Sequence, residues 1–88
     1  SWPALSRHIR SDNSGNSSVA DFVQIDSFNN VIFDARTFNR TPITLVGIND
    51  SIVVQTDDAT MIAAKSESQK IKQLVAKLAK DKRFKHLV

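Results

Sequence analysis

The 88-residue sequence contains no cysteine and no tyrosine, and it has only two glycines and two prolines. The lack of cysteine excludes disulfide bonds and thiolate metal sites. Two glycines, Gly15 and Gly47, are too few for a glycine-rich phosphate loop. No run approaches the roughly 18 apolar residues of a membrane span, and the first residues lack the charged and apolar blocks of a signal peptide. We therefore expect a cytoplasmic domain without a membrane partner.

Charge is distributed unevenly along the chain. Residues 1–64 carry four basic and seven acidic side chains, whereas residues 65–88 carry eight basic and two acidic ones. The overall charge of +3 thus combines a net −3 in the first part with a net +6 in the second. Such a basic segment raises the hypothesis of binding to nucleic acid or to another anionic surface.

Most of the chain is organised in short apolar runs rich in β-branched and aromatic residues, which is typical of strands. The polar breaks between them are too short for a crossover helix. We therefore predict a mainly β domain over residues 19–65, preceded by a lead-in and a loop over residues 1–18. The expected strands are Phe22–Asp26, Val31–Asp34, Ile43–Ile48, Ile52–Thr56 and Thr60–Ala64.

The arrangement of these strands has two interpretations. Short polar breaks such as Asn49–Ser51 suit antiparallel hairpins. However, the sequence has no Asn-Gly or Asp-Gly hairpin signature. The last three runs also recur at an interval of about eight or nine residues, as successive coils of a solenoid would. We predict parallel coils over Phe22–Ala64, with Val53 and Ile62 on parallel strands.

A change of period after residue 65 predicts an amphipathic helix over residues 66–83, followed by a linker over residues 84–88. Ser66 and Gln69 form an S-x-x-Q capping box. The helix repeat places four apolar side chains on one face, and we expect this face to pack on the domain's own core with the lysines in solvent. The four residues are Ile71, Leu74, Val75 and Leu78.

Candidate chemical groups are sparse. Asp57 and Asp58 lack the further spaced oxygen ligands of a calcium loop and fit a turn between strands better. His8 and His86 lie at opposite ends of the chain without zinc-ligand spacing. No serine lies in a nucleophile elbow. We therefore predict no catalytic, cofactor-binding or metal-binding residue in this chain.

Four segments resemble bacterial mannose-1-phosphate guanylyltransferases, and together they cover nearly the whole chain. The most specific is Val46–Ala64, and the others are Ser1–Leu5, Asp21–Asn30 and Ile71–Leu78. The sequence departs from the family pattern at Asp57, where proline is usual, and at Ala20, where glycine is common.

The resemblance implies a short left-handed parallel β-helix of about five strands with a C-terminal helix. It further implies a non-catalytic module of an enzyme that converts GTP and mannose 1-phosphate into GDP-mannose and pyrophosphate. Mg²⁺ and GTP would bind to the catalytic domain that precedes this segment in the family. The implied partners are that catalytic domain and a second copy in a homodimer, and an isomerase domain follows in bifunctional members.

Two other hypotheses remain. The chain could be an independent β domain that binds nucleic acid or an anionic surface through its basic helix, although that helix has no aromatic residue on its polar face to stack on bases. A free-standing enzyme is disfavoured by the lack of a catalytic constellation.

We predict that the purified 88-residue chain releases no pyrophosphate from GTP and mannose 1-phosphate in the presence of Mg²⁺, because it lacks a phosphate loop and a metal-binding carboxylate set. A coupled pyrophosphate assay measures this. Turnover above that of a buffer control would contradict the prediction.

Overall fold

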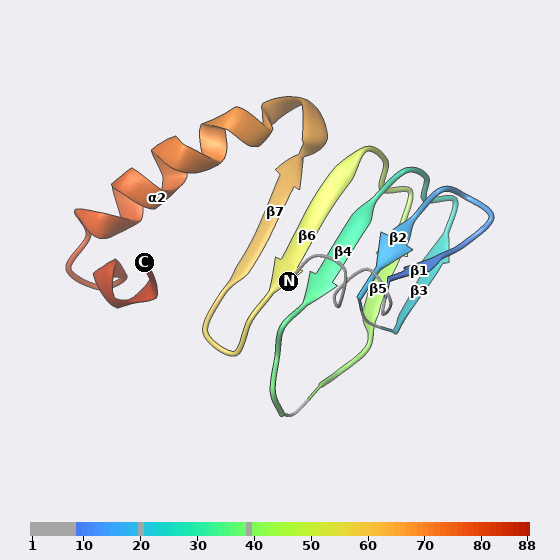
Figure 1. Cartoon of the computed structure of the whole chain (residues 1–88), viewed down its shortest axis with the longest axis horizontal. Helices are drawn as coiled ribbons and strands as arrows, with labels where there is room; N and C mark the ends of the chain where they lie inside the picture. Colours follow the sequence, from blue (N-terminus) through green and yellow to red (C-terminus); the bar gives the residue numbers. More distant parts are fainter. Residues whose placement is uncertain (1–8, 20, 39) are drawn as a thin grey trace.

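The computed structural model describes residues 9–19, 21–38 and 40–88 (Figure 1). The Ser1–Leu5 segment, His8 and Ala20 lie outside the described residues. The described chain forms seven strands followed by three helical segments: β1 (Arg10–Ser11), β2 (Ser17–Ser18), β3 (Phe22–Ile25), β4 (Val31–Asp34), β5 (Ile43–Val46), β6 (Ser51–Gln55), β7 (Thr60–Ala64), the 3₁₀ helix η1 (Lys65–Lys70), the α-helix α2 (Ile71–Ala79) and the 3₁₀ helix η2 (Lys85–Leu87).

The predicted mainly β class with a C-terminal helix is confirmed. The strands form a five-stranded sheet in the order β1-β2-β4-β6-β7 and a two-stranded sheet of β3 and β5. β2–β4, β4–β6 and β3–β5 are parallel pairs, while β1–β2 and β6–β7 are antiparallel. The short strands β1 and β2 form where the sequence suggested only a loop.

Two of the three parallel pairs, β3–β5 and β4–β6, are related by a repeat of 21 residues, whereas Ser17 of β2 pairs with Val31 of β4 across 14 residues. Phe22 pairs with Ile43, and Val31 pairs with Ile52. The corners repeat with the strands. Asn29 and Asp50, 21 residues apart, have φ angles of 58° and 52°. Asparagine and aspartate adopt this left-handed conformation more readily than other non-glycine residues, which explains their presence at equivalent corners.

The prediction that Val53 and Ile62 lie on parallel strands is wrong. They are directly paired in the antiparallel hairpin formed by β6 and β7. Its turn is closed by the Thr56 amide, which donates to the Ala59 carbonyl at 2.9 Å. The interval from Ile52 to Thr60 therefore belongs to this hairpin, whereas the interval from Ile43 to Ile52 joins strands of two different sheets.

The apolar core is small and lies between the two sheets. Ile32 of β4, Leu45 of β5 and Val53 of β6 are its buried members among the described residues, and Phe22 and Ile43 pack against them. Strands with alternating orientation supply one inward side chain every second residue, and four- or five-residue strands therefore contribute few. The core ends at β6, since Ile62 on the neighbouring β7 is 71% exposed.

Two stacked asparagines connect the chain segments that precede the parallel strands β2, β4 and β6, beside this core. The fully buried Asn16 accepts hydrogen bonds at Oδ1 from the Asn30 amide (2.8 Å) and from Asn30 Nδ2 (2.9 Å). The equally buried Asn30 donates from Nδ2 to the Ile48 carbonyl (2.7 Å) and accepts from the Ser51 amide (2.9 Å) at Oδ1. Asn16 Nδ2 also donates to the Ser27 carbonyl (2.7 Å). We call this pair the asparagine ladder.

The C-terminal helix differs from its prediction in extent and in packing. η1 begins at Lys65, one residue before Ser66, and no side chain caps its N-terminus. α2 ends at Ala79 and has no buried residue. Leu74 and Val75 are 42% and 43% exposed, and the expectation that this face packs on the core is therefore wrong. The physical reason is that the core ends at β6, and α2 stands beside the outermost strand β7 (Figure 1). No helix in the described part of the chain is long and apolar enough to cross a membrane.

Asn30→Ala should lower the free energy of unfolding by about 1–3 kcal/mol, because it leaves the Ser51 amide without its partner and removes one of the two hydrogen bonds to the Ile48 carbonyl, which keeps the bond from the Phe28 amide. Urea unfolding of the purified protein measures the loss. Asn13→Ala, at an exposed turn position, is the matched control and should change stability by less than about 0.5 kcal/mol. Equal losses in both variants would show that the ladder contributes nothing specific.

Candidate functional site

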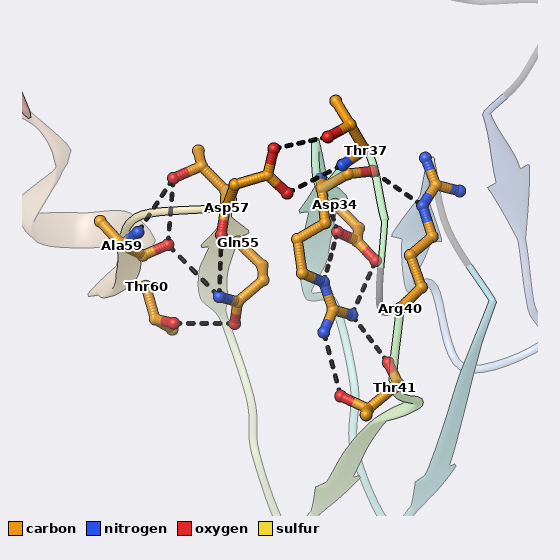
Figure 2. A network of polar contacts seen from close by, with 10 residues as sticks. Asp34, Thr37, Arg40, Thr41, Gln55, Asp57, Ala59 and Thr60 are labelled. Carbon is orange, nitrogen blue, oxygen red and sulfur yellow. Dashed lines mark hydrogen bonds and ion pairs between the residues drawn. The ribbon is translucent and has the colours of Figure 1, made fainter.

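A buried ion pair organises the loop that follows β4 (Figure 2). Asp34 accepts from Arg36 Nε at 2.9 Å and from Arg36 Nη2 at 2.8 Å, one bond on each carboxylate oxygen. Their side chains are only 4% and 11% exposed. The guanidinium also donates to Thr41 Oγ1 (3.0 Å) and to the Thr41 carbonyl (2.7 Å). Both side chains therefore use nearly all of their hydrogen-bond donors and acceptors within the fold.

Asp57 connects the same loop to the β6–β7 turn. Its carboxylate accepts from the Thr37 amide (2.9 Å) and from Thr37 Oγ1 (2.7 Å) (Figure 2). The hydrogen bond from the Thr37 hydroxyl lowers the pKa of Asp57 most, and the bond from the Thr37 amide lowers it further. The turn position expected for the Asp57–Asp58 pair is confirmed, and Asp57 is the one whose carboxylate holds the loop.

The pKa of Asp34 is lowered to about 2, chiefly by the hydrogen bonds from Arg36, which outweigh the opposing effect of burial. A carboxylate held this firmly by a guanidinium stays ionised at neutral pH and accepts no proton from a substrate. Asp34 is therefore a structural group rather than a general base.

The family resemblance places Mg²⁺ and GTP on the catalytic domain that precedes this segment in the family. Within residues 9–19, 21–38 and 40–88, no group of three or more His, Cys, Asp or Glu side chains lies close enough to hold a metal ion. His86 lies in η2, far along the chain from the acidic loops.

Apolar side chains, in contrast, are exposed on three surfaces. The first is a cavity of about 370 Å³ beside the N-terminal strands, which we call the N-terminal cavity. The outward side chains Val31 and Phe33 of β4 line it together with Ile9 and Val19. Ser17 and Ser18 of β2 and the buried Ile32 of β4 complete its lining.

The second surface is the outer face of the β3–β5 sheet. Val23, Ile25 and Val46 are 63%, 61% and 70% exposed, and Ile25 pairs directly with Val46. Sequence reasoning treated these runs only as strands. The alternation of residues in β3 indicates this exposed apolar face. Val23 and Ile25 alternate with the inward Phe22 and Gln24, and they form a continuous apolar row on the outer face of β3.

The third surface is a groove of about 530 Å³ between β7 and α2, which we call the helix groove. β7 contributes Met61 and Ile62 to one wall. The opposite wall holds the four helix residues predicted to be apolar on one face, joined by Phe84 and Leu87 from the end of the chain: Ile71, Leu74, Val75, Leu78, Phe84 and Leu87.

We predict that Asp34→Asn lowers stability at pH 7 by roughly 2 kcal/mol, the value of a carboxyl whose pKa is about 2 when folded and 3.8 when unfolded. The contribution is complete above pH 3.8 and disappears as the pH falls through about 2. The difference between wild type and variant should therefore shrink on acidification, in urea unfolding at pH 7, 4 and 2.5.

Asp58→Asn, at an exposed turn carboxylate, is the matched control and should follow the wild type at every pH. A stability difference between wild type and Asp34→Asn that is the same at pH 7 and pH 2.5 would contradict the assignment.

Curated relatives align with almost the whole chain. XanB, a xanthan biosynthesis protein of Xanthomonas campestris pv. campestris (strain B100), is 30% identical over 78 residues, covering 89% of this chain and 16% of the relative. A mannose-1-phosphate guanylyltransferase of Salmonella montevideo is 32% identical over 87 residues (99% and 18%). The alginate biosynthesis protein AlgA of Pseudomonas syringae pv. tomato is 36% identical over 77 residues (88% and 15%). The chain thus spans less than a fifth of these relatives.

A solved structure shares the fold. A crystal structure described as mannose-1-phosphate geranyltransferase from Thermus thermophilus superimposes with a TM-score of 0.63 and 22% sequence identity. The match covers 88% of this chain and 22% of that chain. Residues 20–78 also match the family described as the MannoseP isomerase/GMP-like β-helix domain. With two thirds of its residues inside that match, the chain belongs to the MannoseP isomerase/GMP-like β-helix domain family.

Proposed function

We propose that this chain is the non-catalytic β-helix module of a mannose-1-phosphate guanylyltransferase, an enzyme that forms GDP-mannose and pyrophosphate from GTP and mannose 1-phosphate. The module packs on the catalytic domain, which binds GTP and Mg²⁺, and supports oligomerisation. The named relatives support the enzyme class. We further propose a cytoplasmic location, which a cysteine-free composition fits.

We also propose that β2 to β6 form the coils of a short left-handed parallel β-helix. The support comes from the three parallel pairs, from the 21-residue register between equivalent strands and from the family to which the chain belongs. The handedness rests on the family resemblance. The β6–β7 hairpin then ends the coils at one side.

The proposed role rests mainly on one observation: polar side chains are buried in this fold, whereas large apolar side chains are exposed. The buried Asp34 and both ladder asparagines are fully engaged inside the fold, while large apolar side chains are exposed on three surfaces. Contiguous exposed apolar surface marks interaction sites more often than catalytic ones. The alternative of nucleic-acid binding gains no support from the relatives.

The N-terminal cavity is the proposed contact with the catalytic domain. It is lined by Ile9, the first residue that the structure describes, together with Val31 and Phe33. Ahead of Ile9 in the sequence, Ser1–Leu5 resembles the end of the family's catalytic-domain motif. Because Ile9 lines the cavity, we propose that apolar side chains of a domain preceding it in the sequence fill the cavity.

A chimeric enzyme tests this proposal. In the Salmonella montevideo relative, the aligned 87-residue segment is replaced by this chain, and GDP-mannose formation is followed by chromatography. We expect the chimera to be active and Phe33→Asp to reduce its activity at least about tenfold, since a charge in an apolar contact costs more than about 1.4 kcal/mol.

Phe38→Asp is the matched control, because Phe38 is 65% exposed in the loop between β4 and β5 and does not line the cavity. It should leave the activity of the chimera within about twofold. Circular dichroism of each isolated 88-residue variant shows whether Phe33→Asp is folded. A folded Phe33→Asp chimera with full activity would refute the proposed contact.

A further inference from the structure

The end of the helix groove is held in a defined conformation by contacts within the chain that follows α2. After α2, the chain turns back through a compact link in which the Asp81 carboxylate accepts from the Arg83 amide (2.9 Å) and from Arg83 Nη2 (2.9 Å). The Arg83 guanidinium lies 4.8 Å from the centre of the Phe84 ring, at a distance typical of a cation–π contact. This link holds Phe84 and Leu87 at the end of the groove.

Charge surrounds the apolar groove on its helical side. At 100° per residue, Lys72 and Lys77 lie on opposite flanks of the stripe formed by Leu74 and Val75. Neither lysine has an ion pair within the described part of the chain, whereas Lys70 pairs with Glu67. The one acidic residue lining the groove is Asp58, at the β6–β7 turn.

These features define the chemistry of an occupant. Amphipathic helices bind in apolar grooves through their apolar face. The groove between two lysine rows is therefore complementary to a helix whose apolar face is flanked by rows of Asp or Glu. A second α2 from another copy would bring lysine rows against lysine rows. α2 itself, with nine residues, is about 13 Å long, so a partner of three to four turns covers it.

We propose that the helix groove binds an acidic amphipathic helix, supplied by the part of the enzyme outside this chain. This deepens the proposed docking role and rests on it. The partner's Leu-type side chains enter between Ile62 and Leu74, and its carboxylates face Lys72 and Lys77. Its acidic rows stay away from the end of the groove that Asp58 occupies.

Binding of designed peptides to the 88-residue chain tests the proposal. The probe is a fluorescein-labelled peptide of about 15 residues, or four turns, with leucines at i, i+3, i+4 and i+7 and glutamates on its flanks. The matched peptide carries lysines in place of the glutamates. We expect saturable fluorescence anisotropy for the acidic peptide and at least about tenfold weaker binding of the basic one, as opposed charge rows require.

Variants locate the peptide. Leu74→Glu should weaken binding of the acidic peptide at least about tenfold, because it places a charge in the apolar contact, while Val46→Glu, on the outer β3–β5 face, should leave it unchanged. Both side chains lie outside the core, and circular dichroism confirms the fold of each variant. The double reversal Lys72→Glu and Lys77→Glu should invert the preference, so that the basic peptide binds more tightly.

Equal binding of both peptides, no binding of either, or an unchanged preference in the double reversal would overturn the proposal. Analytical ultracentrifugation tests a second outcome that would also overturn the proposal. If the chain dimerises with increasing concentration and Leu74→Glu abolishes this dimer, the groove holds a second copy. The chimera assay tests the contact at the N-terminal cavity, and the peptide assay tests the helix groove. A negative result in one assay therefore does not affect the proposal tested by the other.

Discussion

The asparagine ladder is the constraint on which the rest of the structure depends. Asn16 and Asn30 occupy equivalent corners, and the side-chain oxygen of each accepts a hydrogen bond from a backbone amide at the next corner along the sheet: Asn16 from Asn30, and Asn30 from Ser51. A buried polar group without a partner costs about 1–3 kcal/mol. The ladder therefore fixes which corner stacks on which, and this fixes the register of β2, β4 and β6.

The small core follows from the same arrangement. Short strands joined by tight polar corners leave room for three buried apolar side chains among the described residues, and the stack holds together largely through side-chain to backbone hydrogen bonds. Asp34 with Arg36 and Asp57 with Thr37 connect the loops at the opposite end of the strands in a similar way. The buried polar groups are thus engaged within the fold, while several outward side chains of the same strands are apolar.

The stacked parallel strands leave an exposed outer face and open ends, at which apolar side chains reach the surface. The N-terminal cavity, the β3–β5 face and the helix groove are three such surfaces, formed by different elements of the fold. Because the three surfaces are separate, an occupant of one would not compete with an occupant of another.

The sequence by itself determined the strand runs from Phe22 to Ala64, the helix around Leu74 and the lack of a phosphate loop, because these depend on local period and residue type. It also carried the 21-residue repeat, in which Asn29 matches Asp50, but that repeat is weak in identity and becomes visible only when strands are paired. The sequence also indicated a turn at Asp57–Asp58, but tertiary structure decided that the strands on either side of it, β6 and β7, pair with each other in an antiparallel hairpin. Tertiary structure also decided that α2 stays off the core, since an amphipathic stripe specifies that a face needs a partner and not where that partner lies.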